Sequence, residues 1–441
     1  MSHSSSKGPE LYRRAKQRIP GGTQLLSKRP EMFLPERWPS YYASARGIEI
    51  VDLDGDVYLD FSIMAIGACI LGYADPDVDA AVKQTIDNGV ASTLNAPEEV
   101  ELADLLCELH PWADMVRYAR SGGEAMSVAV RIARAHKRRD KVAFSGYHGW
   151  TDWYLAANLG ESTALDGHLL PGLDPTGVPR ELRGSALPFH YNNLDELKQI
   201  VAAHKGELAA IVMEPRRDEP PAPGFLEAVR QIADEIGAVL IFDEVTTGFR
   251  QCLGGIHLTM GIEPDIAVFA KSISNGYAMS AIIGRAAVME AAQSTFISST
   301  NWTERIGPTA AQATIKKLAR AHVNAHNVDI GQRVNAGWKR LGEESGLHVH
   351  TSNLPTLAHF KIEHKEELAL TTLFTQEMLA RGFLAWTQFK PSLAHTPSAV
   401  ADYLVAASEV FALMKDALAK GDLHSRVQGP LQRRGFYRLT S

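Results

Sequence analysis

The sequence predicts an α/β protein built on a doubly wound, mostly parallel sheet. Between about Pro97 and Leu318, short β-branched runs alternate with segments of helical periodicity. Such alternation is typical of strands joined by crossover helices that cover both faces of one sheet. The chain has 441 residues, more than one ordinary domain, so two or three compact units are expected.

The elements of this sheet can be assigned in order along the chain. The segments predicted as strands are short apolar runs: Lys141–Ser145, Ala209–Glu214, Ala238–Asp243, Ile266–Ala270 and Ala281–Gly284. The segments predicted as helices carry apolar residues at three- and four-residue spacing: Glu98–Leu109, Glu124–Arg138, Leu194–His204 and Phe225–Ile236.

The two ends of the chain predict a smaller α+β unit. Gly47–Asp60 alternates polar and apolar residues around an Asp54-Gly55 turn, which is typical of a β-hairpin. The C-terminal part is rich in predicted helices and includes one clear strand: Val328–Gly342, Glu366–Arg381, Val400–Leu418 and the strand Thr356–Ile362. No linker-like segment separates these parts. We therefore expect a large domain at residues 61–320 and a small domain formed by residues 1–60 together with 321–441.

The composition is that of a globular protein with a sizeable core, since 45% of residues are hydrophobic and 22% are charged. The net charge of −6 predicts no general attraction to nucleic acid or to anionic membranes. The basic run Arg134–Arg139 ends a predicted helix, where cations favour the helix dipole, so it indicates a solvated face. The apolar stretch Ser62–Ala74 is too short to span a bilayer.

Cysteine use and the start of the chain both favour a cytoplasmic protein. Cys69, Cys107 and Cys252 form no CxxC pair, so we expect reduced thiols rather than disulfides or zinc ligands, and no metal site. The segment Met1–Gly8 has no apolar core and predicts a flexible tail rather than a signal peptide.

Lys271 and Asp243 are the most informative residues for function. Each comes at the end of an apolar strand run, and ligands of parallel α/β sheets bind beyond the carboxyl ends of the strands. An amine and a carboxylate in one crevice are what pyridoxal phosphate needs, one to form a Schiff base and one to keep the pyridine nitrogen protonated. Taken alone, Lys271 could extend from a strand end to solvent, and Asp243 could cap a helix.

Three further motifs fit the same cofactor. Ser121-Gly122-Gly123 stands directly before a predicted helix, where free backbone N–H groups and the helix dipole favour an anion such as a phosphate. Tyr147 follows a strand and could stack on a pyridine ring. Glu214 ends another strand and could orient a hydrogen-bond network near the ring or the substrate. Each motif alone has an ordinary structural explanation, as a tight turn or a rim residue.

Taken together, the motifs resemble the class III aminotransferases, most closely the branch of glutamate-1-semialdehyde aminomutase. The motifs that recur in this order, over most of the chain, are Ile19–Gly22, Ser121–Ala125, Tyr147–Gly149, Glu214-Pro215, Phe242–Arg250, Ala270–Tyr277 and Leu393–Thr396. The resemblance implies pyridoxal phosphate as cofactor, the fold-type I architecture, and a homodimer with active sites at the subunit interface.

The resemblance also assigns roles by position. Lys271 would be the Schiff-base lysine and proton shuttle, and Asp243 would pair with the pyridinium nitrogen. Val245 would pack on the ring face opposite Tyr147. The residues that would hold the phosphate are Ser121, Gly122, Gly123 and, from the neighbouring subunit, Thr300. Glu214 would lie near the ring hydroxyl or the substrate.

The sequence departs from the aminomutase where that enzyme holds its substrate. Leu25 stands in the position of the aminomutase serine and Lys28 in that of its arginine, and lysine does not replace arginine in bidentate carboxylate binding. A C-terminal glutamate of the aminomutase is Thr387 here. The segment after Glu214-Pro215 is also unusual for the family.

We therefore predict a pyridoxal phosphate-dependent aminotransferase that moves an amino group from a glutamate-like donor to a carbonyl acceptor. An oxo-sugar or aminocyclitol aldehyde of secondary metabolism, as in antibiotic biosynthesis, is the acceptor we favour. An intramolecular aminomutase or an epimerase would use the same Lys271 and Asp243. A nucleotide-dependent dehydrogenase lacks support because no GxGxxG follows a first strand, and a non-catalytic binding protein is disfavoured because Lys271 is present.

Overall fold

The computed structural model describes residues 6–168 and 171–434. It divides into two compact units, one running from Pro76 to Asn324 and one formed by both chain ends, up to Asp75 and from Ala325 onward. The first boundary between the units, after Asp75, comes later than the predicted boundary at residue 60. The second boundary, after Asn324, lies close to the predicted boundary at residue 320. The division into three segments stays a prediction. Most of the predicted N-terminal tail lies outside the described residues, but its last part is helical, because α1 (Lys7–Lys16) includes Gly8.

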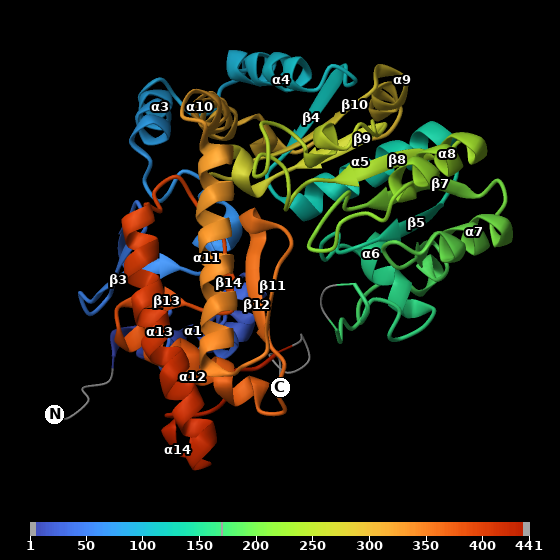
Figure 1. Cartoon of the computed structure of the whole chain (residues 1–441). Coiled ribbons are helices and arrows are strands. Elements are labelled where there is room, and N and C mark those ends of the chain that lie inside the picture. Colours follow the sequence, from blue (N-terminus) through green and yellow to red (C-terminus); the bar gives the residue numbers. More distant parts are fainter. Residues whose placement is uncertain (1–5, 169–170, 435–441) are drawn as a thin grey trace. The chain divides into compact units, whose positions relative to one another are not determined.

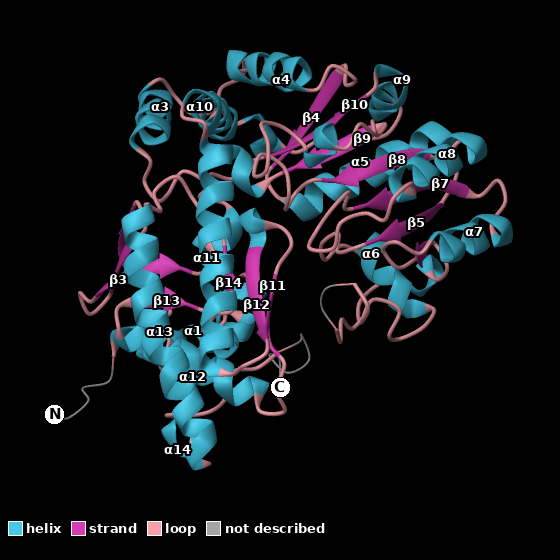
Figure 2. Ribbon diagram, viewed as in Figure 1, coloured by secondary structure: helices cyan, strands magenta, loops and turns pink. Residues whose placement is uncertain are grey.

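A seven-stranded sheet forms the centre of the Pro76–Asn324 unit (Figures 1 and 2). Its strands, in spatial order, are β4 (Met115–Ala119), β10 (Ser280–Gly284), β9 (Ile266–Phe269), β8 (Val239–Asp243), β7 (Leu208–Met213), β5 (Lys141–Ser145) and β6 (Ala186–Pro188). Strands β9 to β6 pair in parallel, and β10 runs antiparallel to both of its neighbours. The predicted mostly parallel sheet is thus confirmed.

Both faces of this sheet are buried, which explains why its strands are apolar at nearly every position. Val239 and Ile241 of β8 pack in one cluster with α5 (Gly122–Lys137), whereas Leu240 and Phe242 pack in another with α8 (Phe225–Ile236). Because successive side chains point to opposite faces, Asp243 continues the face of Ile241. The sequence therefore delivers this carboxylate to the α5 side of the sheet.

Two helices of this unit precede its first strand, and the others lie between or after the strands. They are α3 (Pro76–Asp87), α4 (Pro97–Leu109), α5, α6 (Asp152–Leu155), α7 (Leu194–Ala203), α8, α9 (Ala286–Met289) and α10 (Ile306–Arg320). The predicted helices agree with α4, α5, α7 and α8 to within two residues.

The unit made from the chain ends contains two smaller sheets. One has the order β1 (Tyr42–Arg46), β2 (Glu49–Asp52), β3 (Val57–Phe61), β13 (Phe383–Ala385), and the other β11 (Val349–Thr351), β12 (Ala358–Ile362), β14 (Gln388–Phe389). Its helices include α11 (Val323–Ser345), α12 (Glu367–Ala380), α13 (Pro397–Lys420) and α14 (Leu423–Arg426). The antiparallel β2–β3 pair is the predicted hairpin, and β3 pairs in parallel with β13, so both chain ends share one sheet.

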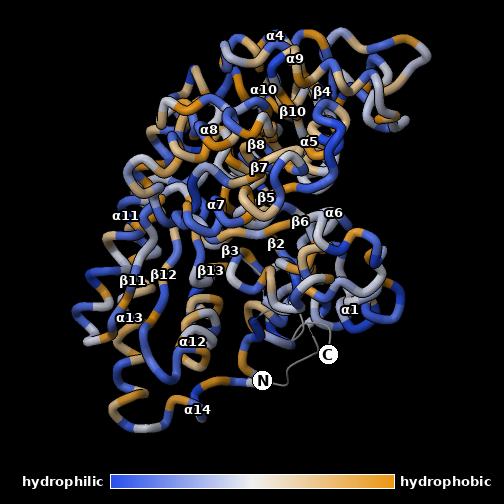
Figure 3. Tube along the Cα trace, turned by 90° about the vertical axis from the view of Figure 1, so that its right-hand side faces the viewer, coloured by the Kyte–Doolittle hydropathy of each residue, from blue (hydrophilic) through white to orange (hydrophobic). Residues whose placement is uncertain are grey.

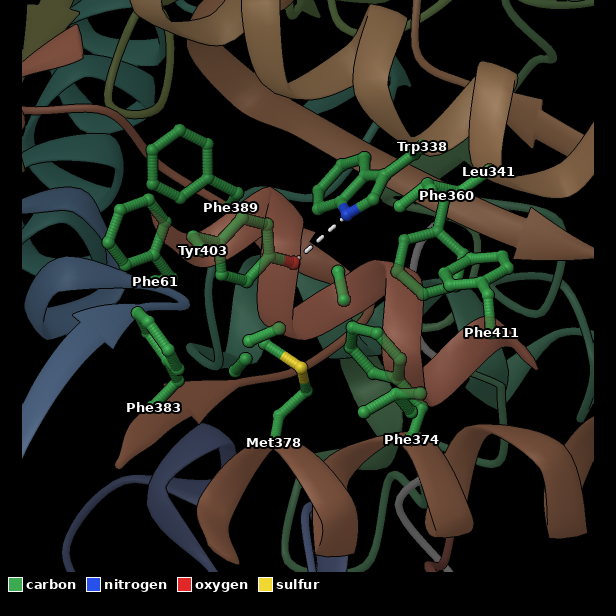
Figure 4. Close-up of a cluster of buried hydrophobic side chains, with 14 of the residues drawn as sticks. Phe61, Trp338, Leu341, Phe360, Phe374, Met378, Phe383, Phe389, Tyr403 and Phe411 are labelled. Atoms are coloured by element: carbon green, nitrogen blue, oxygen red, sulfur yellow. Dashed lines mark hydrogen bonds between the residues drawn. The ribbon is translucent and has the colours of Figure 1, made fainter. Parts of the chain in front are cut away.

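The core of this second unit is aromatic (Figure 4). Phe61 stacks on Tyr403 with ring centroids 4.5 Å apart. The Tyr403 hydroxyl accepts a hydrogen bond of 2.9 Å from the Trp338 indole Nε1–H. This bond satisfies the polar atoms of two buried side chains that would otherwise be left without partners.

Among the described residues, α13 is the one helix whose length and apolar composition would suffice to cross a membrane. Hydrophobic and hydrophilic residues are interspersed along this helix (Figure 3). The buried side carries Tyr403, Ala407, Val410 and Met414, while charged residues such as Glu409 lie on the exposed side. The apolar content of α13 is accounted for by packing in the core.

Candidate active site

Lys271 begins a short turn directly after β9. The turn Lys271–Ser274 is a 3-10 helix, and its first residue has a left-handed backbone with φ of 50°. Left-handed backbone is uncommon outside glycine and persists where the surroundings enforce it. The lysine side chain is thereby fixed at the carboxyl end of the parallel strands, where ligands of such sheets bind.

Protein atoms surround the Lys271 amine. Its Nζ donates a hydrogen bond of 2.8 Å to the Thr246 hydroxyl. The Lys271 pKa is lowered to about 8, and burial is the largest cause. The charges of Arg217 and Arg250 also lower this pKa, whereas those of Asp243 and Glu214 raise it by a smaller amount. With a pKa of about 8, a minor but appreciable part of the amine is neutral near pH 7, and the neutral amine is the form that attacks carbonyl groups.

Asp243, at the end of the adjacent strand β8, is buried and fully hydrogen-bonded. Its Oδ1 accepts the backbone N–H of Val245 at 3.0 Å, and its Oδ2 lies 2.8 Å from Nδ1 of His148. The other ring nitrogen of His148, Nε2, lies 3.1 Å from the carbonyl oxygen of Ser145. Both ring nitrogens of this buried histidine thus face oxygen atoms, one of the Asp243 carboxylate and one of the Ser145 carbonyl.

Tyr147 and Glu214 join the same edge of the sheet. The Glu214 carboxylate, buried just after β7, accepts the Tyr147 N–H at 3.4 Å. Burial and the charge of Asp243 raise the pKa of the Tyr147 hydroxyl. The φ of Gly146 is 109°, and a Cβ there would lie 2.8 Å from Glu214 Oε2. Glycine before Tyr147 therefore lets the glutamate approach the backbone.

The glycine turn at the start of α5 forms a cradle beside Val245. Glu124 Oε2 accepts the Ser121 N–H at 2.9 Å and so closes the helix start. A Cβ on Gly122 would lie 2.9 Å from Val245 Cγ1, and one on Gly123 would lie 3.1 Å from Trp150 Nε1. Only glycine permits this close packing. The first-turn N–H groups have no partner inside the helix and are available to an anion.

Thr300 is placed differently from the other predicted site residues. It is exposed, begins the turn Thr300–Thr303, and its carbonyl oxygen accepts a hydrogen bond from the Thr303 hydroxyl. In the part of the chain that the structure describes, no hydrogen bond or ion pair joins Thr300 to Lys271 or Asp243. The place of this threonine in the site therefore stays a prediction.

An amine, a buried carboxylate and a glycine cradle at one edge of the sheet fit a phosphorylated aldehyde with a basic ring nitrogen. A family model described as Aminotransferase class-III matches residues 35–394. This chain belongs to that family. It is an enzyme with pyridoxal phosphate as cofactor, as the sequence predicted.

Relatives of known name agree with this assignment. The chain is 32% identical over 420 residues to the 3-aminobutyryl-CoA aminotransferase of Cloacimonas acidaminovorans, covering 90% of this chain and 97% of that protein. It is 34% identical over 406 residues to the glutamate-1-semialdehyde 2,1-aminomutase of Roseiflexus castenholzii, covering 87% and 92%. Its fold matches the internal aldimine form of the Sphingopyxis FumI protein with a TM-score of 0.84 at 25% identity, covering 93% and 97%.

Sequence reasoning missed two residues that contact the predicted pair. His148 lies in the Tyr147–Gly149 motif, which was singled out for its tyrosine and glycine, and Thr246 lies directly after Val245. A histidine three residues after the end of β5, at the edge of the sheet where β8 ends in Asp243, was the available signal. The partner of each residue is distant in sequence, so only the fold identifies the contacts.

The pH dependence of cofactor uptake tests the environment of Lys271. Because its pKa is about 8, the neutral amine increases about tenfold per pH unit below that value and levels off above it. We expect the rate at which the apoprotein gains the visible absorption of bound pyridoxal phosphate to follow this profile. The Lys271→Ala variant should gain no such absorption at any pH. If the rate of uptake had its midpoint near pH 10.5, the ordinary pKa of lysine, this result would contradict the burial of the amine.

Proposed function

We propose that this enzyme moves an amino group from a glutamate-like donor to a carbonyl acceptor, using Lys271 as nucleophile and proton carrier. The observation that supports this most is the partly neutral Lys271 amine beside the fixed Asp243 carboxylate. Transfer in two half-reactions requires both groups, because one must take and return a proton while the other holds a positive charge.

Bound pyridoxal phosphate supplies a carbonyl that accepts amines and a ring that withdraws electrons. Lys271 Nζ would remove the proton from the amine-bearing carbon of the donor and deliver it to the carbon that carried the carbonyl oxygen of the cofactor. Asp243 holds the proton on the ring nitrogen. The residues that bind and orient the cofactor in this proposal are Ser121, Gly122, Gly123, Tyr147, Glu214 and Val245.

For the acceptor, we propose an oxo-sugar or aminocyclitol aldehyde of secondary metabolism, such as antibiotic biosynthesis. The support comes from Leu25, Lys28 and Thr387, which replace the residues expected of an aminomutase. The two relatives described above are named for different substrates, so membership of the family does not fix the acceptor. The relative named as an aminomutase, at 34% identity, favours intramolecular amino transfer as the second candidate.

We also propose a cytoplasmic homodimer. Three free cysteines, Cys69, Cys107 and Cys252, support a reducing compartment. The exposed position of Thr300 supports a role toward a second copy, because an exposed hydroxyl is available to a neighbouring chain. In the dimer, each phosphate would receive one hydrogen bond from the threonine of the partner.

A donor screen tests the proposed reaction. Amino donors offered singly to the holoenzyme should convert the visible absorption of the bound aldehyde into that of pyridoxamine phosphate, and a carbonyl acceptor should reverse the change. Lys271→Ala should lower proton transfer by about 10²- to 10⁴-fold, while the exposed Lys198→Ala should not. No conversion with any donor would refute the aminotransferase. Efficient conversion of glutamate-1-semialdehyde to 5-aminolevulinate would establish the aminomutase instead.

The role of Asp243 is tested by Asp243→Asn. An opposite charge within about 4–6 Å moves a pKa by about 1–3, so removing it should leave roughly 10- to 1,000-fold less of the ring nitrogen protonated. Turnover should fall in proportion, while the cofactor absorption is retained. The exposed Asp195→Asn provides the matched control. Activity of Asp243→Asn within a few-fold of wild type would reduce Asp243 to a structural residue.

The shared site is tested by combining two impaired chains. Thr300→Ala should weaken cofactor affinity, since a hydrogen bond to a charged group is worth about 1.5–3 kcal/mol. A purified heterodimer of the Lys271→Ala and Thr300→Ala chains contains one site with both native residues. That site should bind cofactor tightly and turn over normally at limiting pyridoxal phosphate. Heterodimers without such a site would show that Thr300 does not act across the interface.

A further inference from the structure

The loop after β7 carries two arginines that the proposed function has not used. It begins at Glu214-Pro215 and continues with Arg216, Arg217 and Asp218. This loop leaves the carboxyl end of a central parallel strand, so its residues lie at the same edge of the sheet as Lys271. A glutamate-like donor needs a cation for its carboxylate, and Lys28 occupies the position of the aminomutase arginine.

Arg217 is placed to supply that cation. Its Nη1 lies 3.5 Å from Glu214 Oε2, a distance at the outer limit of hydrogen bonding. This Nη1 is shielded from solvent and makes no hydrogen bond to any residue that the structure describes. The side chain as a whole is 32% exposed, so solvent reaches part of it. A buried donor without an acceptor costs stability unless a ligand completes it.

The charge of Arg217 influences two groups of the candidate active site. After burial, its positive charge is the largest influence that lowers the Lys271 pKa, ahead of Arg250. The charge of Arg217 also lowers the pKa of Tyr147, which opposes the increase that burial causes. Arg216 differs, since its charge acts on the pKa of Tyr191, whose hydroxyl donates to the Pro215 carbonyl at 2.7 Å. The charge of Arg217 thus reaches Lys271 and Tyr147, and its ion pair with Glu214 ties it to the same edge of the sheet.

We propose that Arg217 binds the carboxylate of the amino donor and of the oxo acid formed from it, and so selects anionic donors. This inference rests on the proposed aminotransferase function and concerns the same site. The planar guanidinium fork matches a carboxylate with two parallel hydrogen bonds, which lysine does not reproduce. Glu214 holds Arg217 in the absence of substrate through an ion pair that is long enough to exchange for the donor carboxylate.

The test compares donors that differ only in the carboxylate. L-alanine and isopropylamine share the amine-bearing carbon, and isopropylamine has a methyl group in place of the carboxylate. We expect Arg217→Met to slow cofactor conversion by L-alanine and by L-glutamate about 10- to 100-fold, and conversion by isopropylamine less than about threefold. Arg217→Lys should show the same selective loss to a smaller degree. Arg216→Met, the matched control, should leave all three rates near wild type.

A binding measurement provides a readout that does not depend on turnover. Glutarate has two carboxylates and no amine, so it cannot react, and its dissociation constant can be measured by calorimetry on the holoenzyme. We expect Arg217→Met to raise this constant about 10- to 100-fold and Arg216→Met to leave it unchanged.

The outcomes separate this inference from the proposed function. Equal losses with L-alanine and isopropylamine, or unchanged glutarate affinity in Arg217→Met, would overturn the role of Arg217 while the aminotransferase assignment stands. Absence of conversion by any amine in the wild-type enzyme would instead overturn the proposed function. If Arg217→Met does not take up cofactor, the donor comparison and the glutarate measurement are made on Arg217→Lys, and these decide the question.

Discussion

The site depends on bringing a lysine amine and a carboxylate together where the carboxylate is buried and the amine is largely shielded from water. Removing either charge from water is costly unless it is neutralised, paired or hydrogen-bonded. The structure treats the two groups differently. Burial and neighbouring arginines favour the neutral form of Lys271, whereas Asp243 is satisfied by the Val245 N–H and by His148. The result is a nucleophilic amine beside a stable buried anion.

The parallel sheet makes this arrangement possible. Strands β7, β8 and β9 are neighbours that run in one direction, so the residues after their carboxyl ends meet at one edge. The alternation of side chains along β8 directs Asp243 to the face on which α5 begins. The glycine cradle at the start of α5 then lies against Val245, two residues beyond Asp243. Register and helix placement together therefore position the amine, the acid and the anion cradle.

Much of this sheet could be predicted because its strands are short apolar runs between helices. The bounds of β5 and α8 agree with the predicted segments at both ends. Strand β4 was not predicted, because its Arg117 and Tyr118 are half-buried at the sheet edge and the segment lacks a buried-strand pattern. The reversed direction of β10 also has no signature in its own residues, since an apolar run does not encode strand direction.

Site residues were predictable to the extent that their chemistry was visible locally. Lys271 and Asp243 stood out because charged residues at the ends of apolar runs are costly. Roles that depend on tertiary contacts were not visible, because the partners of His148 and Thr246 lie far away in sequence. The proposed role of Thr300 requires a second chain, which no single-chain contact can reveal.

The distribution of contacts also suggests why one scaffold serves enzymes named for different substrates. Gly122 and Val245 are packed within van der Waals contact, so changing either one disturbs the cradle as well as its neighbours. Arg217 lies in a loop, is partly exposed, and is held by one long ion pair, so its replacement disturbs little packing. Loop residues positioned by a rigid sheet are free to change specificity at small cost in stability. Common chemistry can thus stay with the strand ends while the choice of donor is set in the loop that follows β7.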